Sequence, residues 1–140
     1  MPAPPREKQH VIIIDDDPIS NLLTEEKIKT VHNKECIHSF VNPEFGLERI
    51  NTLLSKNINE SIILLLDINM PNINGWDALD KLKAMFEDLN TKSVRIYMLS
   101  SSIDMNDKIK AYNNPLVSGY FEKPLSVRDF MDLIFKNNYL

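Results

Sequence analysis

Short apolar runs alternate with segments of helical spacing along the whole chain. The runs are rich in Val, Ile and Leu and predict strands buried on both faces. They span residues 10–14, 35–40, 61–66, 94–99 and 117–121. Between and after them, apolar residues recur every three or four positions and predict helices, over residues 18–31, 43–54, 76–89, 104–112 and 126 to near the C-terminus. Strands that alternate with helices favour an α/β fold, with a parallel sheet covered on both faces.

The same pattern predicts helix ends and apolar sides. Asp17 reads as an N-cap before a proline at the first helical position, and Ser126 as the cap of the last helix. Pro115 ends the fourth helix, which is short. The apolar positions of the first helix are Ile19, Leu22, Leu23, Ile28 and Val31, and those of the second are Phe45, Leu47, Ile50, Leu53 and Leu54.

Polar residues stand where the predicted strands end. Asp15 and Asp16 follow the first strand, Asp67 the third, Ser100 the fourth and Lys123 the fifth. The carboxyl ends of parallel strands lie at one edge of a sheet, where ligands bind, so we expect these groups to meet. Two unit charges 4 Å apart repel by about 4 kcal/mol at an effective dielectric constant near 20. A divalent cation relieves this repulsion, and all-oxygen ligation favours Mg²⁺.

This setting predicts phosphoryl chemistry. Asp67 can attack phosphorus as a carboxylate nucleophile and form an aspartyl phosphate. Lys123 is placed to neutralise the phosphoryl oxygens, and the Ser100 hydroxyl to donate a hydrogen bond to one of them.

Four motifs carry a family resemblance. VIIIDDDP, LLLDINMPNINGWD, YMLSSS and GYFEKPL, in this order, resemble the bacterial response-regulator receiver domain, with a chemotaxis-regulator-like, single-domain organisation. The resemblance covers about residues 10–138. It implies a flavodoxin-like doubly wound (βα)5 fold with a five-stranded parallel sheet of order 2-1-3-4-5. It also implies a phosphorelay function, in which a sensor histidine kinase or a histidine phosphotransfer protein donates the phosphoryl group.

The resemblance assigns roles to individual residues. It implies that phosphorylation changes the surface of the fourth helix, fifth strand and fifth helix, which then signals to a partner protein. It further implies an Mg²⁺ site, with Asp16 as direct ligand and Asp15 acting through water. The remaining roles are phosphoacceptor and metal ligand for Asp67, metal ligation by the Asn69 backbone carbonyl, phosphate binding and switching for Ser100, Ser101 and Lys123, inward rotation for Tyr120, and a cis peptide for Lys123-Pro124.

Two alternatives stay open. A haloacid-dehalogenase-type phosphatase also begins with an apolar strand and Asp-x-Asp, and its nucleophile would be Asp15. After Lys123, however, only Asp129 and Asp132 could supply the further acidic motif that this family needs, and DINMPNING is left unexplained. A pseudo-receiver has the same fold without phosphorylation, but this chain has all the expected site residues.

Composition narrows the partners and the compartment. The 140 residues suffice for one domain, which we expect over residues 10–140 behind a flexible tail, 1–9. A net charge of −4 gives no sign of direct nucleic-acid binding. No apolar run approaches the roughly 20 residues of a membrane span, and no secretory segment is recognisable, so we expect a cytoplasmic protein. Cys36 is expected to be a small buried hydrophobe.

The last helix has no effector domain after it, which predicts a stand-alone regulator or a phosphorelay intermediate. We expect a monomer or a weak phosphorylation-dependent dimer. External substrate turnover is not expected, although the site should hydrolyse its own acyl phosphate, with Asn69 and Ser102 steering the water. Residues 57–60 and 88–91 are expected to form longer loops than is usual in the family.

Overall fold

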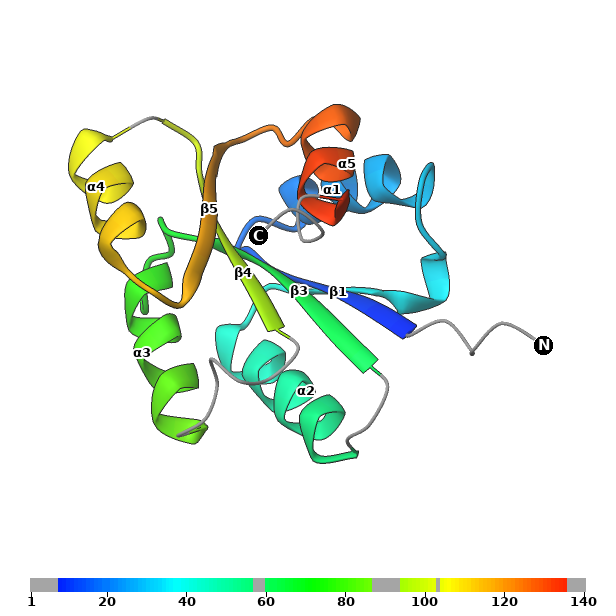
Figure 1. Cartoon of the computed structure of the whole chain (residues 1–140). Coiled ribbons are helices and arrows are strands. Elements are labelled where there is room, and N and C mark those ends of the chain that lie inside the picture. Colours follow the sequence, from blue (N-terminus) through cyan, green and yellow to red (C-terminus); the bar gives the residue numbers. More distant parts are fainter. Residues whose placement is uncertain (1–7, 57–59, 87–93, 103, 136–140) are drawn as a thin grey trace.

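A computed structural model describes residues 8–56, 60–86, 94–102 and 104–135. Its five strands are all parallel and follow the order β2-β1-β3-β4-β5; β1, β3, β4 and β5 are labelled in Figure 1. The flavodoxin-like fold is therefore confirmed. The strands are β1 (Lys8–Ile14), β2 (Ile37–Phe40), β3 (Glu60–Asp67), β4 (Val94–Ser100) and β5 (Val117–Glu122).

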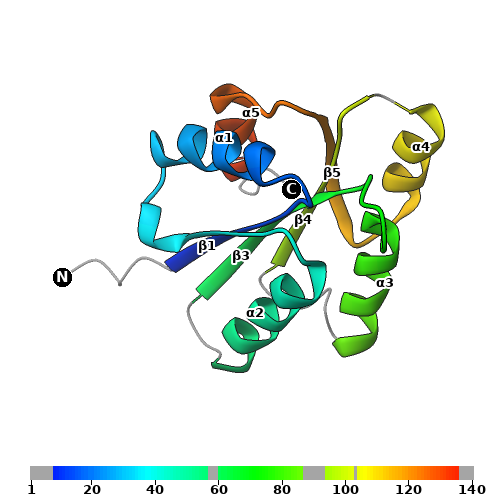
Figure 2. The same ribbon diagram turned by 180° about the vertical axis from the view of Figure 1, so that it is seen from behind.

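Helices cover both faces of the sheet. They are α1 (Pro18–Lys29), α2 (Pro43–Lys56), α3 (Gly75–Met85), α4 (Met105–Asn113) and α5 (Val127–Phe135). α1 and α5 lie on one face, with α2 and α3 on the other, as Figures 1 and 2 show.

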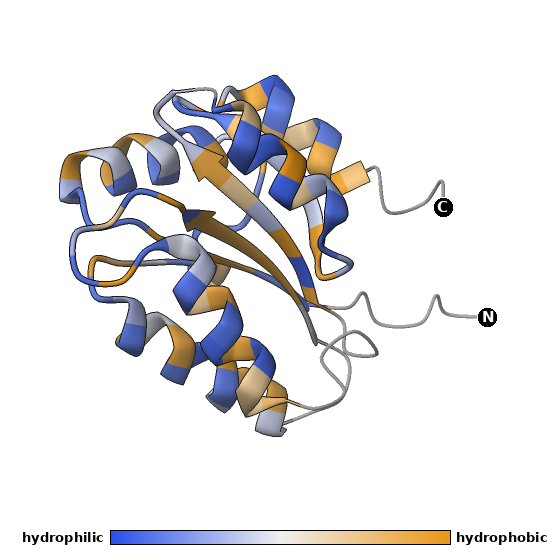
Figure 3. Cartoon of the chain, turned by 90° about the vertical axis from the view of Figure 1, so that its left-hand side faces the viewer, coloured by the Kyte–Doolittle hydropathy of each residue, from blue (hydrophilic) through white to orange (hydrophobic). Residues whose placement is uncertain are grey.

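The apolar character of the central strands follows from this double cover. In β1, Ile12 and Ile14 pack into the cluster beneath α2 and α3, whereas Val11 and Ile13 pack into the cluster beneath α5. Figure 3 shows the contrast between the apolar strands and the mixed surfaces of the helices. None of the helices in the described ranges is both long and apolar enough to cross a membrane.

Some predicted boundaries were wrong by a few residues. β1 begins at Lys8 rather than at His10. β2 begins at Ile37 because the preceding Lys34–Cys36 segment forms a 3₁₀ turn, capped by the side chain of Asn33. α3 ends at Met85, where Phe86 turns to an extended backbone. Its predicted continuation to residue 89 and the predicted long loops lie at least partly outside the described residues.

The apolar side predicted for α1 was correct at Ile28 and wrong at its other four positions. Its buried residues are Asn21, Thr24 and Ile28, whereas Ile19, Leu22, Leu23 and Val31 are exposed. In α2, Leu47, Ile50 and Leu53 are buried as predicted, but Phe45 is exposed. The reason in α1 is that Asn21 Nδ2 donates a 2.9 Å hydrogen bond to the backbone carbonyl of Asp15, which turns a polar position inward.

The predicted caps are confirmed. The Asp17 carboxylate accepts the Ile19 N–H at 2.9 Å and begins α1. Ser126 and Asp129 exchange side-chain and backbone hydrogen bonds at the start of α5, which is a capping box. Cys36 is buried, and the Lys123-Pro124 peptide is cis.

Candidate functional site

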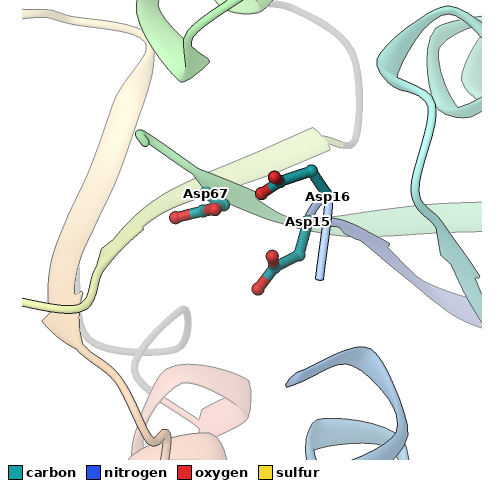
Figure 4. A group of neighbouring side chains, drawn as sticks. All are labelled: Asp15, Asp16 and Asp67. Atoms are coloured by element: carbon teal, nitrogen blue, oxygen red, sulfur yellow. The ribbon is translucent and has the colours of Figure 1, made fainter. Parts of the chain in front are cut away.

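Three carboxylates gather where β1 and β3 end side by side. Asp15 and Asp16 directly follow β1, and Asp67 is the last residue of β3 (Figure 4). One oxygen of each lies within 4.8 Å of the others. Asp15 and Asp67 are buried, and Asp16 is exposed. An all-oxygen cluster of this kind suits Mg²⁺, which binds through one or two carboxylates and keeps several waters.

The Asp15 carboxylate is fixed through both of its oxygens. Its Oδ1 accepts the Asp17 N–H at 3.0 Å. Its Oδ2 accepts hydrogen bonds from Ser20 Oγ at 2.7 Å and Lys123 Nζ at 2.8 Å. Burial favours a higher pKa for Asp15, but these donors outweigh burial and hold its pKa below the ordinary value. Asp15 is therefore an ionised, immobile side chain.

Lys123 reaches the cluster from the loop after β5. Its Nζ lies 2.8 Å from Asp15 Oδ2 and 3.4 Å from Asp67 Oδ1, and its backbone N–H donates to the Ser100 carbonyl at 2.7 Å. Burial favours a lower pKa for the Lys123 ammonium, but the two carboxylates raise it above its ordinary value. Lys123 therefore stays charged and links the two acids.

Asp67 is the electrostatically unsatisfied member of the cluster. Burial, followed by repulsion from Asp15, raises its pKa to about 6. Its Oδ1 receives only long contacts of 3.4 Å, from Lys123 and from the Asn69 N–H. No hydrogen bond from the described part of the chain reaches its Oδ2. The negative charge of the cluster fits a divalent cation beside Asp16 and Asp67.

Ser100 is buried at the end of β4, but its hydroxyl points elsewhere. Ser100 Oγ donates to the Ser102 carbonyl at 2.6 Å and accepts from Asn69 Nδ2 at 3.3 Å. The Tyr120 hydroxyl donates to the same Ser102 carbonyl at 3.4 Å. Ser100 and Tyr120, two of the predicted switch residues, thus share one acceptor. Ser101 is exposed beyond the strand.

Sequence reasoning missed the residues that support this cluster. Ser20 and Asn21 of α1 hold Asp15, and no motif marks them. Gly75 begins α3, and its N–H donates to the Ile68 carbonyl at 2.9 Å. A Cβ at Gly75 would lie 2.6 Å from the backbone oxygen of Asp67, so only glycine allows this close approach. Its place in the DINMPNING segment was the available signal.

Comparisons with known proteins agree with this geometry. Residues 11–135 match the family model of the response regulator receiver domain. The chain is 28% identical over 126 residues to the nitrate/nitrite response regulator protein NarL of Escherichia coli (strain K12), covering 90% of this chain and 53% of that protein. It is 23% identical to the sensor protein GacS of Pseudomonas syringae pv. syringae, covering 90% of this chain and 13% of that protein. The chain thus spans about half the length of NarL and a smaller share of GacS.

Solved structures are similar over nearly the whole chain. A two component response regulator from Cytophaga hutchinsonii is 34% identical, with a TM-score of 0.81, covering 94% of this chain and 97% of that chain. A response regulator receiver protein from Dyadobacter fermentans DSM 18053 is similar in fold, with a TM-score of 0.75 at 23% identity, covering 91% and 96%. With the family model matched over most of its length, the chain belongs to the response regulator receiver domain family.

Proposed function

We propose that Asp67 accepts a phosphoryl group from a phosphohistidine of a sensor kinase or phosphotransfer protein, in an Mg²⁺-dependent step. The observation that carries this proposal is the position of Asp67, between two carboxylates and the ammonium of Lys123. In the reaction an Asp67 oxygen forms a bond to phosphorus while the donor's N–P bond breaks, and its electron pair returns to the imidazole. Mg²⁺ would supply charge neutralisation, and Lys123 would hold the phosphoryl oxygens.

Asp15 is the alternative nucleophile, as in a phosphatase of the haloacid-dehalogenase type. Both of its oxygens accept hydrogen bonds at 3.0 Å or less, and its pKa lies below the ordinary value. Asp67 Oδ1 receives only two contacts of 3.4 Å, from Lys123 and the Asn69 N–H, so its carboxylate is less tied by hydrogen bonds and freer to attack phosphorus. The family match also favours Asp67.

Phosphopeptide mapping separates these alternatives. The protein is incubated with acetyl phosphate and Mg²⁺, and the modified aspartate is located by mass spectrometry. We expect the label on Asp67, with none in Asp67→Asn and very little when EDTA replaces Mg²⁺. A label on Asp15 would refute the assignment. The absence of a label in the wild type would favour a pseudo-receiver. A second test is thermal stability with Mg²⁺ and beryllofluoride, because a ligand at roughly 100 times its dissociation constant stabilises the folded protein by about 2.7 kcal/mol. Unchanged thermal stability would also favour a pseudo-receiver.

A surface for a protein donor lies beside the site. Ile19, Leu22 and Leu23 form an apolar group in the first two turns of α1, and each is more than half exposed. Such a group marks a contact surface more often than a chance arrangement. We expect Leu22→Glu to slow phosphoryl transfer from a phosphorylated histidine protein while labelling by acetyl phosphate is unchanged. Equal slowing of both reactions would contradict a docking role.

The proposed output surface is formed by α4, β5 and α5. Met105, Ile109 and Tyr112 line one side of α4 and are 62%, 53% and 89% exposed. Beside them, Tyr112 and Tyr120 contribute to a groove of about 330 Å³ between α4 and β5. These apolar side chains supply a surface for a downstream protein.

A change of hydrogen-bond partner by Ser100 would couple this surface to the site. A phosphoryl group on Asp67 attracts the Ser100 hydroxyl away from the Ser102 carbonyl, because an anionic acceptor forms the stronger hydrogen bond. The Ser102–Tyr120 contact then rearranges, and Tyr120 turns inward, which shifts the population of two existing states. We expect Ser100→Ala to be labelled on Asp67 but to lose most of the conformational response, measured by near-ultraviolet circular dichroism. An unchanged response would refute the coupling.

Three further roles belong to the proposal. Ser101 is expected to assist phosphate binding, and Asn69 and Ser102 to steer the water that hydrolyses the acyl phosphate. These roles are tested by the decay rate of labelled Asp67 in the Ser101→Ala and Asn69→Ala variants, with unaltered decay counting against them.

A further inference from the structure

Trp76 joins α3 to α4. It is the single tryptophan of the chain and lies in the first turn of α3, only 7% exposed. Its indole Nε1–H donates to Asp107 Oδ1 at 3.0 Å. Lys110 Nζ lies 4.9 Å from the centre of its ring, within the range of a cation–π interaction. One side chain therefore contacts a carboxylate and an ammonium that are nearly one turn apart on α4.

α4 has few other anchors in the described ranges. It has nine residues, of which only Ala111 is buried. At its N-cap, the Asp104 N–H lies 3.5 Å from Tyr120 Oη, the upper limit of a hydrogen bond. So short a helix is not stable alone in water, and its position therefore depends on such contacts. The bond from Trp76 to Asp107 is the shortest of these side-chain contacts.

The start of α3 abuts the phosphorylation site. Gly75 leaves no room for a side chain against the backbone of Asp67. Trp76 and Asp107 line one shallow groove of about 620 Å³ together with Asp16 and Asn69. The side chains that line this groove therefore extend from Asp16 and Asn69 to Asp107 of α4.

Phosphorylation would disturb the lining of this groove at Asn69. In the unmodified protein Asn69 Nδ2 donates to Ser100 Oγ, and the Asn69 N–H approaches Asp67 Oδ1. In the proposed function the phosphoryl group replaces the Asn69 N–H contact at Asp67, and it draws Ser100 Oγ toward itself, which alters the bond from Asn69 Nδ2. Asn69 begins the short segment that leads into α3 at Gly75. A shift of this segment therefore reaches Trp76 without passing through Tyr120.

We propose that the contact of Trp76 with Asp107 and Lys110 holds α4 in its unphosphorylated position, as a second link from Asp67 to α4. Trp76 is thus a positioning residue, because it does not touch the reacting atoms. This inference rests on the proposed function for its trigger. The holding role itself belongs to the unmodified protein and is tested there.

Hydrogen exchange of the whole metal-free chain, followed by mass spectrometry, tests the holding role. We expect the amides of α4 to exchange about tenfold faster in Asp107→Ala, and also in Trp76→Phe, which loses the indole N–H and part of the ring. Asp107→Asn keeps an oxygen acceptor and should bring exchange back toward the wild type. Asp80→Ala, on the exposed side of α3, is the control and should change nothing in α4. The proposal would be overturned if the α4 amides of Asp107→Ala exchanged as slowly as those of the wild type. It would also be overturned if Asp107→Asn exchanged as fast as Asp107→Ala.

The link to phosphorylation is tested with Mg²⁺ and beryllofluoride. In the wild type we expect the emission of Trp76 to change and α4 exchange to rise by about tenfold. In Asp107→Ala, α4 is already released, so the same addition should raise exchange by less than about twofold. Equal increases in both proteins would overturn the link. If neither the Trp76 emission nor the α4 exchange of the wild type changed with beryllofluoride, the proposed function and the link would both be overturned. The exchange experiment without metal would still decide the holding role.

Discussion

The charge on Asp67 destabilises the metal-free protein at neutral pH. Burial and the neighbouring Asp15 raise its pKa from 3.8 to about 6. Between these pH values the folded state binds more protons than the unfolded state. Protonated Asp67 therefore makes no unfavourable contribution to the free energy of unfolding below the unfolded pKa of 3.8, and the protein loses stability as the pH rises through about 6. Asp67→Asn replaces the carboxylate by a neutral group of the same shape. It should therefore raise the free energy of unfolding at about pH 7.5.

The magnitude follows from the two pKa values. One pKa unit corresponds to about 1.4 kcal/mol, so a rise from 3.8 to about 6 sets an upper bound of about 3 kcal/mol. The exposed Asp16 marks a side of the site that is open to water, which screens the repulsion. The amide also loses the 3.4 Å contact with Lys123. We therefore expect a net gain of about 1–2 kcal/mol, equivalent to roughly 3–6 °C in Tm.

Urea unfolding in EDTA measures this gain at about pH 7.5 and pH 4.5. At the lower pH Asp67 is largely protonated in the folded protein, so the gain should fall to about one third. Asp80→Asn, an exposed position on α3, makes the same change in net charge and should leave stability within about 0.5 kcal/mol of the wild type. The reasoning is refuted if Asp67→Asn is no more stable than the wild type at neutral pH, or if its gain is independent of pH.

Three further predictions concern the groups around the site and the core. Lys123→Met leaves two buried carboxylates without their cation. Its free energy of unfolding, measured in urea without metal, should be about 3 kcal/mol lower than that of the wild type, and Mg²⁺ should restore part of the loss. An unchanged urea midpoint would contradict the role of the ion pair. Burial and neighbouring positive charge lower the pKa of His38, so stability should fall as the pH decreases below the unfolded value of about 6.5. Urea titrations in the Asp67→Asn background should show this fall, and His38→Gln should remove it. Tyr97→Phe loses the 3.2 Å hydrogen bond to a backbone carbonyl of α5 and should cost about 1 kcal/mol in urea unfolding, with equal stability arguing against that bond.

The polar site was predictable because its residues are placed by topology. Asp15, Asp67, Ser100 and Lys123 each stand at or just beyond the carboxyl end of a strand, and these ends lie along one edge of a parallel sheet. The strands themselves were recognisable because burial on both faces requires a continuous apolar run. The structure accordingly brings Asp15, Asp67 and Lys123 within ion-pair distances. No long-range side-chain contact had to be known for this prediction.

Contacts that depend on a single side-chain orientation could not be predicted. The Ser102 carbonyl, which accepts from both Ser100 and Tyr120, is a backbone group without a sequence signal. The bond from Trp76 to Asp107 joins residues that are 31 positions apart, and neither belongs to a periodic pattern that points to the other. Spacing predicts which elements form, whereas these contacts depend on how two finished elements meet.

The orientation of α1 connects this limit to function. Helical spacing predicted that Ile19, Leu22 and Leu23 lie on the buried side of the helix, and the hydrophobic effect alone favours burying them. Full burial of such side chains is worth about 1.5–3 kcal/mol each. Other contacts therefore orient the helix: Ile28 is buried on its inner side, and Ser20 and Asn21 form hydrogen bonds to Asp15. The same bonds that fix the acidic site thus turn an apolar surface outward beside it, as a protein phosphodonor would require.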